Sequence, residues 1–150
     1  MQLFNTLGRR KEDLGKPAHG KAFRVYTCGP TVYDFAHIGN LSSYLFVDLL
    51  IRTLENLEKT PVRWAMNLTD VGHLTEDDIG VGDGGEDKLE KGARREGKTP
   101  REVANFFTEE FLKDSRKLRF REPDERPRAT DFIEEQLELV EKLIDAGFAY

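Results

Sequence analysis

The sequence has very little cysteine, and what it lacks limits where the protein can work. A single cysteine, Cys28, stands among 150 residues, so no disulfide can form within the chain. This usage is typical of proteins from a reducing compartment. The first ten residues contain no sustained apolar core of the kind that a secretory signal peptide needs. These absences predict a cytoplasmic protein.

A long apolar run and an excess of positive charge are also missing. The apolar segment Leu45–Leu57 is too short and too charged to span a bilayer, which predicts no membrane partner. The net charge is −5, which argues against a surface that coats nucleic acid. Basic residues do cluster within 94–101 and 113–121; such clusters are either solvated helix faces or a local RNA contact.

The first half of the chain predicts a strand–helix–strand unit. Lys21–Thr27 has strand character, and Asn40–Leu57 is a helix that is apolar on most faces. Val62–Leu68 is the next strand, with Val62, Trp64, Met66 and Leu68 on one face. Two strands joined by a helix are expected to be parallel, with a right-handed crossover. Before them, residues 1–20 are expected to form an extended arm that pairs at a sheet edge. The length suffices for one domain with a core.

The second half predicts a loop and two helices. Residues 72–86 are rich in glycine and carboxylates and are expected to form a mobile loop. Thr99-Pro100-Arg101-Glu102 has the pattern of a capping box at a helix start, and a rigid linker is expected at Glu122–Arg128. A last helix is expected from about Asp131 to Ala146. The residues expected to face inward are Val103, Phe106, Phe107, Phe111 and Leu112 in the first helix and Phe132, Ile133, Leu137, Val140, Leu143 and Ile144 in the last.

The segment Cys28–Asn40 carries the candidate chemistry, because it follows the first predicted strand and leads into the first long helix. Ligands of α/β proteins bind at such strand ends, and phosphates favour helix N-termini. His37 and Asn40 can hydrogen-bond to phosphate or ribose oxygens, and Gly39 leaves room for a base. Alternatively, His37 is a helix cap or a core residue whose hydrogen bonds are satisfied within the fold. Cys28 is either a zinc ligand or a small buried apolar residue.

The letters CGPTVYDFAHIGN of this segment closely resemble the first signature of cysteinyl-tRNA synthetases, which are class I aminoacyl-tRNA synthetases. The resemblance continues through separate blocks in the same order. These blocks are LFNTLGRRKE, NLTD (Asn67–Asp70), EDKLEKGARREGKT and PRATDFIEEQLELVEKLIDAGFAY. The chain is therefore identified as similar to the N-terminal part of that family.

The resemblance implies an α/β fold: the first half of a Rossmann-like, HIGH-type nucleotide-binding parallel sheet, followed by helices of an inserted connective module. By this reading, residues 1–71 form the Rossmann-like half, 72–86 an insertion, and 87–150 the helices that lead into the module. The implied activity is a ligase that activates cysteine with ATP to cysteinyl-adenylate and transfers it to tRNA(Cys). The implied metals are Mg²⁺ and one Zn²⁺, and the enzyme is expected to be a monomer.

The family also implies roles for single residues. His37 and Asn40 correspond to catalytic positions of the HIGH motif, and Cys28 to a zinc ligand whose metal binds the substrate thiolate. The positions implied for ATP are Pro30, Thr31, His37, Ile38, Gly39 and Asn40. The positions implied for substrate cysteine are Gly29, Thr31 and Thr69.

Two departures from the family pattern limit the expectation. The other zinc ligands and the second ATP motif of the family fall beyond Tyr150, so residues 1–150 alone are not expected to charge tRNA. The usual run after Thr69-Asp70-Val71 is interrupted by the insertion, which leaves His73 without an assigned role. Two other readings stay open: a ligase that joins cysteine to an amino sugar, and a non-catalytic module that binds cysteine or a nucleotide.

Overall fold

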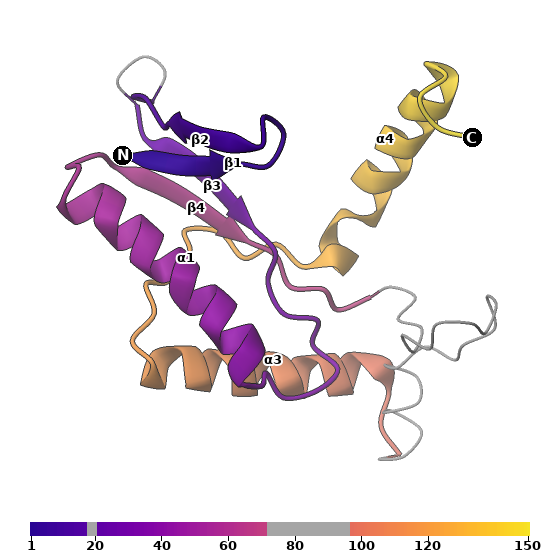
Figure 1. Cartoon of the computed structure of the whole chain (residues 1–150). Coiled ribbons are helices and arrows are strands. Elements are labelled where there is room, and N and C mark those ends of the chain that lie inside the picture. Colours follow the sequence, from indigo (N-terminus) through magenta and orange to yellow (C-terminus); the bar gives the residue numbers. More distant parts are fainter. Residues whose placement is uncertain (18–20, 72–96) are drawn as a thin grey trace.

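The elements follow one another as a hairpin, a strand–helix–strand unit and two further helices (Figure 1). A computed structural model describes residues 1–17, 21–71 and 97–150. The expected loop at 72–86, which includes His73, lies outside these residues, as does the first part of the helical region expected at 87–150. The elements are β1 (Gln2–Asn5), β2 (Arg10–Asp13), β3 (Phe23–Thr27), α1 (Ile38–Asn56), β4 (Val62–Met66), α3 (Pro100–Lys117), a 3-10 turn (Ala129–Phe132) and α4 (Ile133–Asp145).

Strands β3 and β4 form the parallel pair that the sequence predicts. Their register runs from Phe23 opposite Val62 to Thr27 opposite Met66, and α1 connects them along the chain. The alternation in β4 is also confirmed, because Val62, Trp64 and Met66 are buried, as is Leu68 beyond the strand. The expected strand–helix–strand unit is therefore present.

Helix α1 packs one side on this sheet and its N-terminal half on α3, which lies across the foot of α1 in Figure 1. Its buried residues are Tyr44, Asp48, Ile51 and Leu54. The Tyr44 ring meets Phe111 of α3 edge to face, with 5.3 Å between ring centroids. Only one side of this largely apolar helix is buried by the described residues. Its other side, with Leu45, Phe46 and Leu49, is exposed, because no described element covers it.

The segment expected to be a linker also pairs with the free edge of β4. The backbone N–H of Met66 donates to the Glu125 carbonyl at 3.0 Å, and that of Leu68 to the Pro127 carbonyl at 2.8 Å. Proline lacks a donor but keeps its carbonyl, so it can line a sheet edge as an acceptor. The prolines of this segment therefore do not keep it away from the sheet.

The N-terminal arm forms its own hairpin rather than an extended edge strand. Strands β1 and β2 pair antiparallel, from Gln2 opposite Asp13 to Asn5 opposite Arg10, in a sheet separate from β3 and β4. The turn is stabilised by Asn5, whose Oδ1 accepts from the Leu7 N–H at 3.0 Å. Asparagine side chains commonly close turns in this way.

Helices α3 and α4 form as expected but differ in burial. In α3 the capping box of Thr99 and Glu102 is present, and Val103, Phe107 and Phe111 are buried, whereas Phe106 is 42% exposed. Helix α4 projects away from the rest of the described chain (Figure 1). Its expected inward face is exposed at 39–59%, since none of the described residues packs over it. The six exposed residues of this expected inward face are Phe132, Ile133, Leu137, Val140, Leu143 and Ile144.

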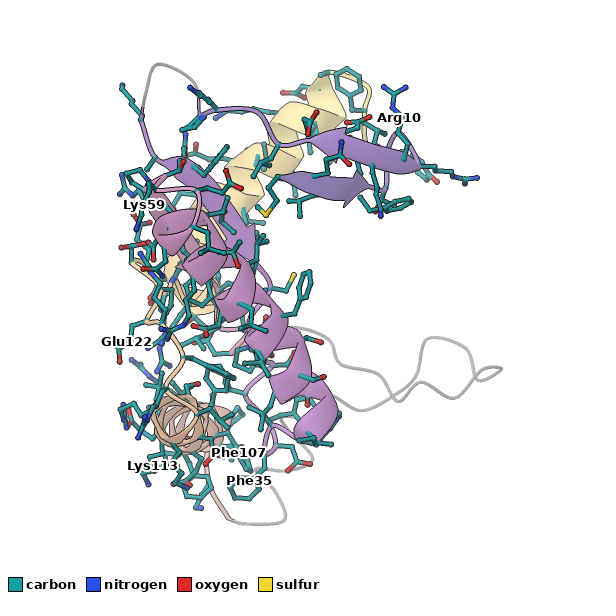
Figure 2. All side chains as sticks on the ribbon, turned by 60° about the vertical axis from the view of Figure 1, so that its left-hand side comes forward. Arg10, Phe35, Lys59, Phe107, Lys113 and Glu122 are labelled. Atoms are coloured by element: carbon teal, nitrogen blue, oxygen red, sulfur yellow. The ribbon has the colours of Figure 1, made fainter. Side chains whose placement is uncertain are left out.

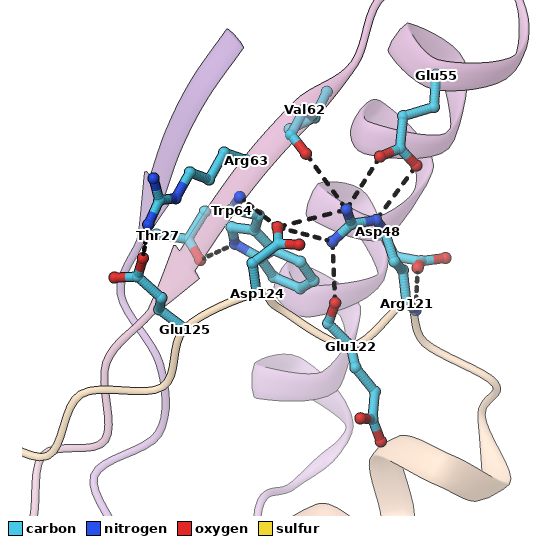
Figure 3. Close-up of polar contacts among 10 residues, drawn as sticks. All are labelled: Thr27, Asp48, Glu55, Val62, Arg63, Trp64, Arg121, Glu122, Asp124 and Glu125. Carbon is cyan, nitrogen blue, oxygen red and sulfur yellow. Dashed lines mark hydrogen bonds and ion pairs between the residues drawn. The ribbon is translucent and has the colours of Figure 1, made fainter. Parts of the chain in front are cut away.

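A polar network around Arg121 ties α1 to β4 (Figure 3). The guanidinium forms an ion pair with Glu55 of α1 at 3.0 Å and one with Asp124 at 3.3 Å, and it donates to the Val62 carbonyl at 3.3 Å. Burial lowers the pKa of Arg121, but the hydrogen bonds and charges of Glu55 and Asp124 outweigh it and leave the pKa raised. The arginine therefore stays charged and joins both elements to the chain after α3.

The buried carboxylate of this network is Asp48, which is 4% exposed. Its Oδ1 accepts from the backbone N–H of Arg121 at 2.6 Å and its Oδ2 from Arg52 Nε at 2.7 Å. A buried carboxylate is tolerated only when its oxygens are paired in this way. Asp48 is thus a fixed joint between α1 and the start of the segment that pairs with β4.

Replacing Asp48 by alanine is expected to lower the free energy of unfolding by about 1–3 kcal/mol, because a part-buried N–H loses its acceptor. The loss should appear even though alanine is the better helix former. Urea unfolding of the purified protein measures it. Asp13→Ala, at an exposed position of β2, is the matched control and should change little; equal losses in both variants would contradict the role of Asp48.

Candidate functional site

The site lies where the chain leaves the carboxyl ends of β3 and β4. Beyond the strands the two segments stay paired, with Thr31 opposite Thr69 in a parallel bridge. The Thr69 N–H donates to the Pro30 carbonyl at 3.0 Å, and the Val32 N–H donates to the Thr69 carbonyl at 3.1 Å. The site residues expected in Cys28–Asn40 and in Asn67–Asp70 therefore lie at one edge of the sheet, as parallel strands require.

Gly29 and Asn67 make the closest approach between these segments. The Gly29 N–H donates to Asn67 Oδ1 at 3.0 Å. A Cβ at position 29 would lie 1.8 Å from the Asn67 carbonyl oxygen, so only glycine fits. Asn67 Nδ2 donates in turn to Thr69 Oγ1 at 3.0 Å. The sequence motifs did not mark Asn67 as a site residue, although it opens the block Asn67–Asp70.

Cys28 follows β3 directly and has an exposed, unbridged thiol. It is therefore not the buried apolar residue of the alternative interpretation. Thiolate is a ligand that zinc prefers, so Cys28 fits as one donor. Across 1–17, 21–71 and 97–150, however, no group of three or more His, Cys, Asp or Glu could hold a metal ion. Within these ranges Cys28 is therefore not part of a ready cluster of three such ligands.

Tyr44 lies close enough to Cys28 for their charges to interact. Burial raises the pKa of Tyr44, and the negative charge that Cys28 can carry raises it further. The phenol therefore stays neutral at physiological pH.

His37 and Asn40 form the cap of α1. The helix begins at Ile38 with His37 as its N-cap, two residues before the expected start. His37 Nδ1 accepts from the Gly39 N–H at 3.0 Å, and Asn40 Oδ1 accepts from the His37 N–H at 3.2 Å. Both side chains thus satisfy backbone donors of the first turn, as in other capping boxes. The interpretation of His37 as a cap is therefore correct.

The cap also fixes the chemistry of the imidazole. A ring nitrogen that accepts a hydrogen bond carries no proton, so the neutral ring holds its proton on Nε2. The ring is exposed, and Nε2–H is available to donate. No acidic residue lies in the first turn of α1, where an anion is favoured by the helix dipole. Capping and anion binding are therefore compatible roles.

Gly39 leaves the space that the His37 ring occupies in its capping position. A Cβ at position 39 would lie 2.9 Å from His37 Cε1 and 3.1 Å from Nδ1. The space that a side chain would fill is taken by the imidazole. The neighbouring Ile38 is 84% exposed, at the first position of the helix.

One pocket collects several residues that the sequence assigned to ATP. The wall includes Pro30, Thr31, His37 and Asn40, which were expected, together with Tyr33, Asp34, Phe35, Ala36 and Tyr44, which were not. Ile38, Gly39 and the residues expected for cysteine, except Thr31, are not part of its wall. Asp34 offers a carboxylate oxygen of the kind that Mg²⁺ prefers.

Aromatic rings support this pocket from α3. Phe35 meets Phe107 edge to face with 5.1 Å between centroids and Phe106 at 6.1 Å; Figure 2 shows Phe35 and Phe107 near the foot of α1. Such pairs contribute beyond the area that they bury. The segment before α1 is thus held against α3 rather than left as a free loop.

A second polar joint stabilises the segment after β4. Asp70 accepts from the Thr130 N–H at 3.0 Å and from the Thr130 hydroxyl at 2.7 Å, and it pairs with Arg128 at 3.5 Å. Arg128 also donates to Asn105 of α3 at 2.9 Å. Asp70 therefore connects the site to both C-terminal helices.

Comparison with known proteins identifies the family. Residues 14–150 match the model of the tRNA synthetases class I (C) catalytic domain. The cysteine–tRNA ligase of Treponema denticola is 45% identical over 150 residues, which are 100% of this chain and 29% of that protein. Those of Chlorobaculum tepidum and Salinibacter ruber are 43% and 45% identical, over 100% and 99% of this chain and 30% and 29% of theirs.

The chain belongs to the class I (C) tRNA synthetase catalytic-domain family. This confirms the resemblance found in the sequence, and an α/β fragment with a small parallel sheet is compatible with it. The chain spans about 30% of the length of the relatives that it matches. Among the residues that the structure describes, no helix is both long and apolar enough to cross a bilayer.

Replacing Gly39 by alanine is expected to destabilise the His37 cap. Alanine is favoured over glycine in a helix by up to about 1 kcal/mol, but its Cβ displaces the imidazole, and a lost N-cap costs about 0.5–2 kcal/mol. The single variant should therefore gain nothing or lose stability. In a His37→Ala background the same change should stabilise the protein. Urea unfolding of all four proteins measures this, and an equal effect in both backgrounds would refute the contact.

Proposed function

We propose that this chain is part of a cysteine–tRNA ligase, which activates cysteine with ATP to cysteinyl-adenylate and transfers it to tRNA(Cys). The observation that carries the proposal is the pairing of two features at one sheet edge: the thiol of Cys28 after β3 and the capped N-terminus of α1. The identity of 43–45% over the whole chain to proteins named cysteine–tRNA ligase supports it.

The pocket beside α1 is proposed to hold ATP. In adenylate formation the cysteine carboxylate attacks the α-phosphorus and pyrophosphate leaves, so negative charge shifts among phosphoryl oxygens. His37 would donate from Nε2–H to one of them, because its Nδ1 is occupied by the Gly39 N–H. Asn40 would hold the cap through Oδ1 and present its amide to the nucleotide. Pro30 and Thr31 line the same pocket, and Ile38 and Gly39, between His37 and Asn40 at the start of α1, complete the proposed ATP site.

The edge of Gly29, Thr31 and Thr69 is proposed to hold the cysteine substrate. Cys28 would bind Zn²⁺ together with ligands from elsewhere in the intact enzyme. When bound, this ion would take the substrate thiolate as a ligand and so discriminate cysteine from serine, whose hydroxyl is a much weaker ligand for zinc. The exposure of Cys28 at the strand end supports this role.

Further parts of the proposal concern the whole enzyme. The fold would be the first half of a Rossmann-like sheet followed by helices of a connective module. Mg²⁺ would accompany ATP, with the Asp34 carboxylate at the pocket as a candidate ligand. The enzyme would be a cytoplasmic monomer that takes cysteine, ATP and tRNA(Cys) as substrates.

Cys28→Ser in the intact enzyme is expected to lower the zinc content per protein and to raise KM for cysteine, while the unfolding transition stays in place. The reason is that a hydroxyl replaces a thiolate donor at an exposed position. Metal analysis and cysteine-dependent pyrophosphate exchange measure the two effects. Wild-type zinc content and wild-type KM in the variant would mean that Cys28 has no part in the site.

His37→Ala in the intact enzyme is expected to slow adenylate formation by about 10²–10³-fold, with a smaller effect on ATP binding. The imidazole donor acts most where charge develops, and its loss is felt mainly in the transition state. Pyrophosphate-exchange kinetics at varied ATP separate kcat from KM. An unchanged kcat would leave His37 as a helix cap alone.

A further inference from the structure

The side chain of Asn67 joins the segment after β3 to the segment after β4 at the proposed cysteine site. Its Oδ1 accepts from the Gly29 N–H, and its Nδ2 donates to Thr69 Oγ1, each at 3.0 Å. The orientation of the amide follows from chemistry: a backbone N–H can only donate, so the oxygen must face Gly29 and the nitrogen must face Thr69. Both ends of this half-buried side chain are therefore committed.

The amide also decides what Thr69 can do. A threonine hydroxyl has one proton to donate and two lone pairs to accept with. Here Oγ1 accepts from Asn67, while the backbone N–H and carbonyl of Thr69 are paired with Pro30 and Val32. Within the described ranges, the hydroxyl proton has no acceptor. Oγ1 keeps its proton and one lone pair, so towards a negatively charged group of a ligand Thr69 acts as a hydrogen-bond donor.

We propose that Asn67 is a positioning residue that makes Thr69 a donor to the carboxylate of the amino-acid substrate. The inference rests on the proposed function. It adds Asn67 to the site and names the carboxylate as the substrate group that Thr69 binds. Among the groups of a bound amino acid, the carboxylate is the charged acceptor that such a donor fits.

The contact with Gly29 gives Asn67 a second positioning role. Because Oδ1 takes the Gly29 N–H, the peptide between Cys28 and Gly29 is held in one orientation, and with it the start of the Cys28 side chain. The backbone bridge of Thr31 and Thr69 already joins the two segments. Loss of the Asn67 side chain would therefore remove one of several links between the segments and leave their backbone pairing in place.

Asn67→Asp tests the proposal in the intact enzyme. The aspartate keeps an oxygen for the Gly29 N–H but puts a second oxygen where Nδ2 was, so the Thr69 hydroxyl turns to donate to it. KM for cysteine in pyrophosphate exchange is expected to rise roughly 10- to 100-fold, as for the loss of a hydrogen bond to a charged group. KM for ATP, the zinc content and the unfolding temperature should stay near wild type.

A Thr69→Val background separates this route from simple repulsion between two carboxylates. If Asn67 acts through the Thr69 hydroxyl, Asn67→Asp adds little to the KM for cysteine once that hydroxyl is gone. Repulsion alone would raise KM equally in both backgrounds and would overturn the proposal. Asn56→Asp, the same amide-to-carboxylate change at an exposed residue of α1 that donates to the Arg52 carbonyl, should leave both KM values unchanged.

Failure of the role of Asn67 and failure of the proposed function give different results. If the wild-type enzyme shows cysteine-dependent exchange and Asn67→Asp leaves KM for cysteine unchanged, only the role of Asn67 is rejected. A general loss, with both KM values raised and the unfolding temperature lowered, would assign Asn67 to the fold and also reject it. If the wild-type enzyme shows no cysteine-dependent exchange, the proposed function falls and the inference with it.

Discussion

The hydrogen bonds between the chain after β3 and the chain after β4 hold the site together. They begin with Gly29 on Asn67 and continue through the bridge of Thr31 and Thr69. No side chain fits at position 29, because the Asn67 carbonyl oxygen occupies its place. The thiol of Cys28, the hydroxyl of Thr69 and the start of α1 are therefore positioned by one pairing at the edge of a two-stranded sheet.

The rest of the described chain keeps that edge in place. Asp48 and Arg121 fix α1 against β4 and against the segment that pairs with its free edge. The Phe35 ring rests on Phe107 of α3, and Asp70 holds Thr130. Each contact joins elements that are distant in sequence. A small sheet with so few strands depends on such joints, because its own backbone pairing is marginal.

Much of this could be predicted from sequence because it follows local rules. The alternation of Val62, Trp64 and Met66, the capping box at Thr99 and the parallel pair with its helix are all confirmed. The motif from Cys28 to Asn40 indicated the family, which the comparisons confirm. Four of the positions that the resemblance implies for ATP, namely Pro30, Thr31, His37 and Asn40, line one pocket.

The remainder depends on contacts that no local pattern contains. The prolines at 122–128 predict a linker, yet carbonyls of this segment accept hydrogen bonds from the N–H groups of Met66 and Leu68. The apolar side of α4 predicts that this side is buried. Its exposure in the structure shows that the described residues do not cover it, and the sequence of a helix does not say which other part of a protein packs on it. Asn67 was not marked because its role arises only where its amide meets Gly29 and Thr69.

Native-state amide hydrogen exchange tests the central claim most directly. The N–H groups of Gly29, Val32 and Thr69 cross between the two segments, so they should exchange slowly, with one common opening free energy close to that of the amides paired between β3 and β4. Exchange of the three amides at the rate of unprotected backbone, while β3 and β4 stay protected, would show that the segments are not joined and would contradict the account.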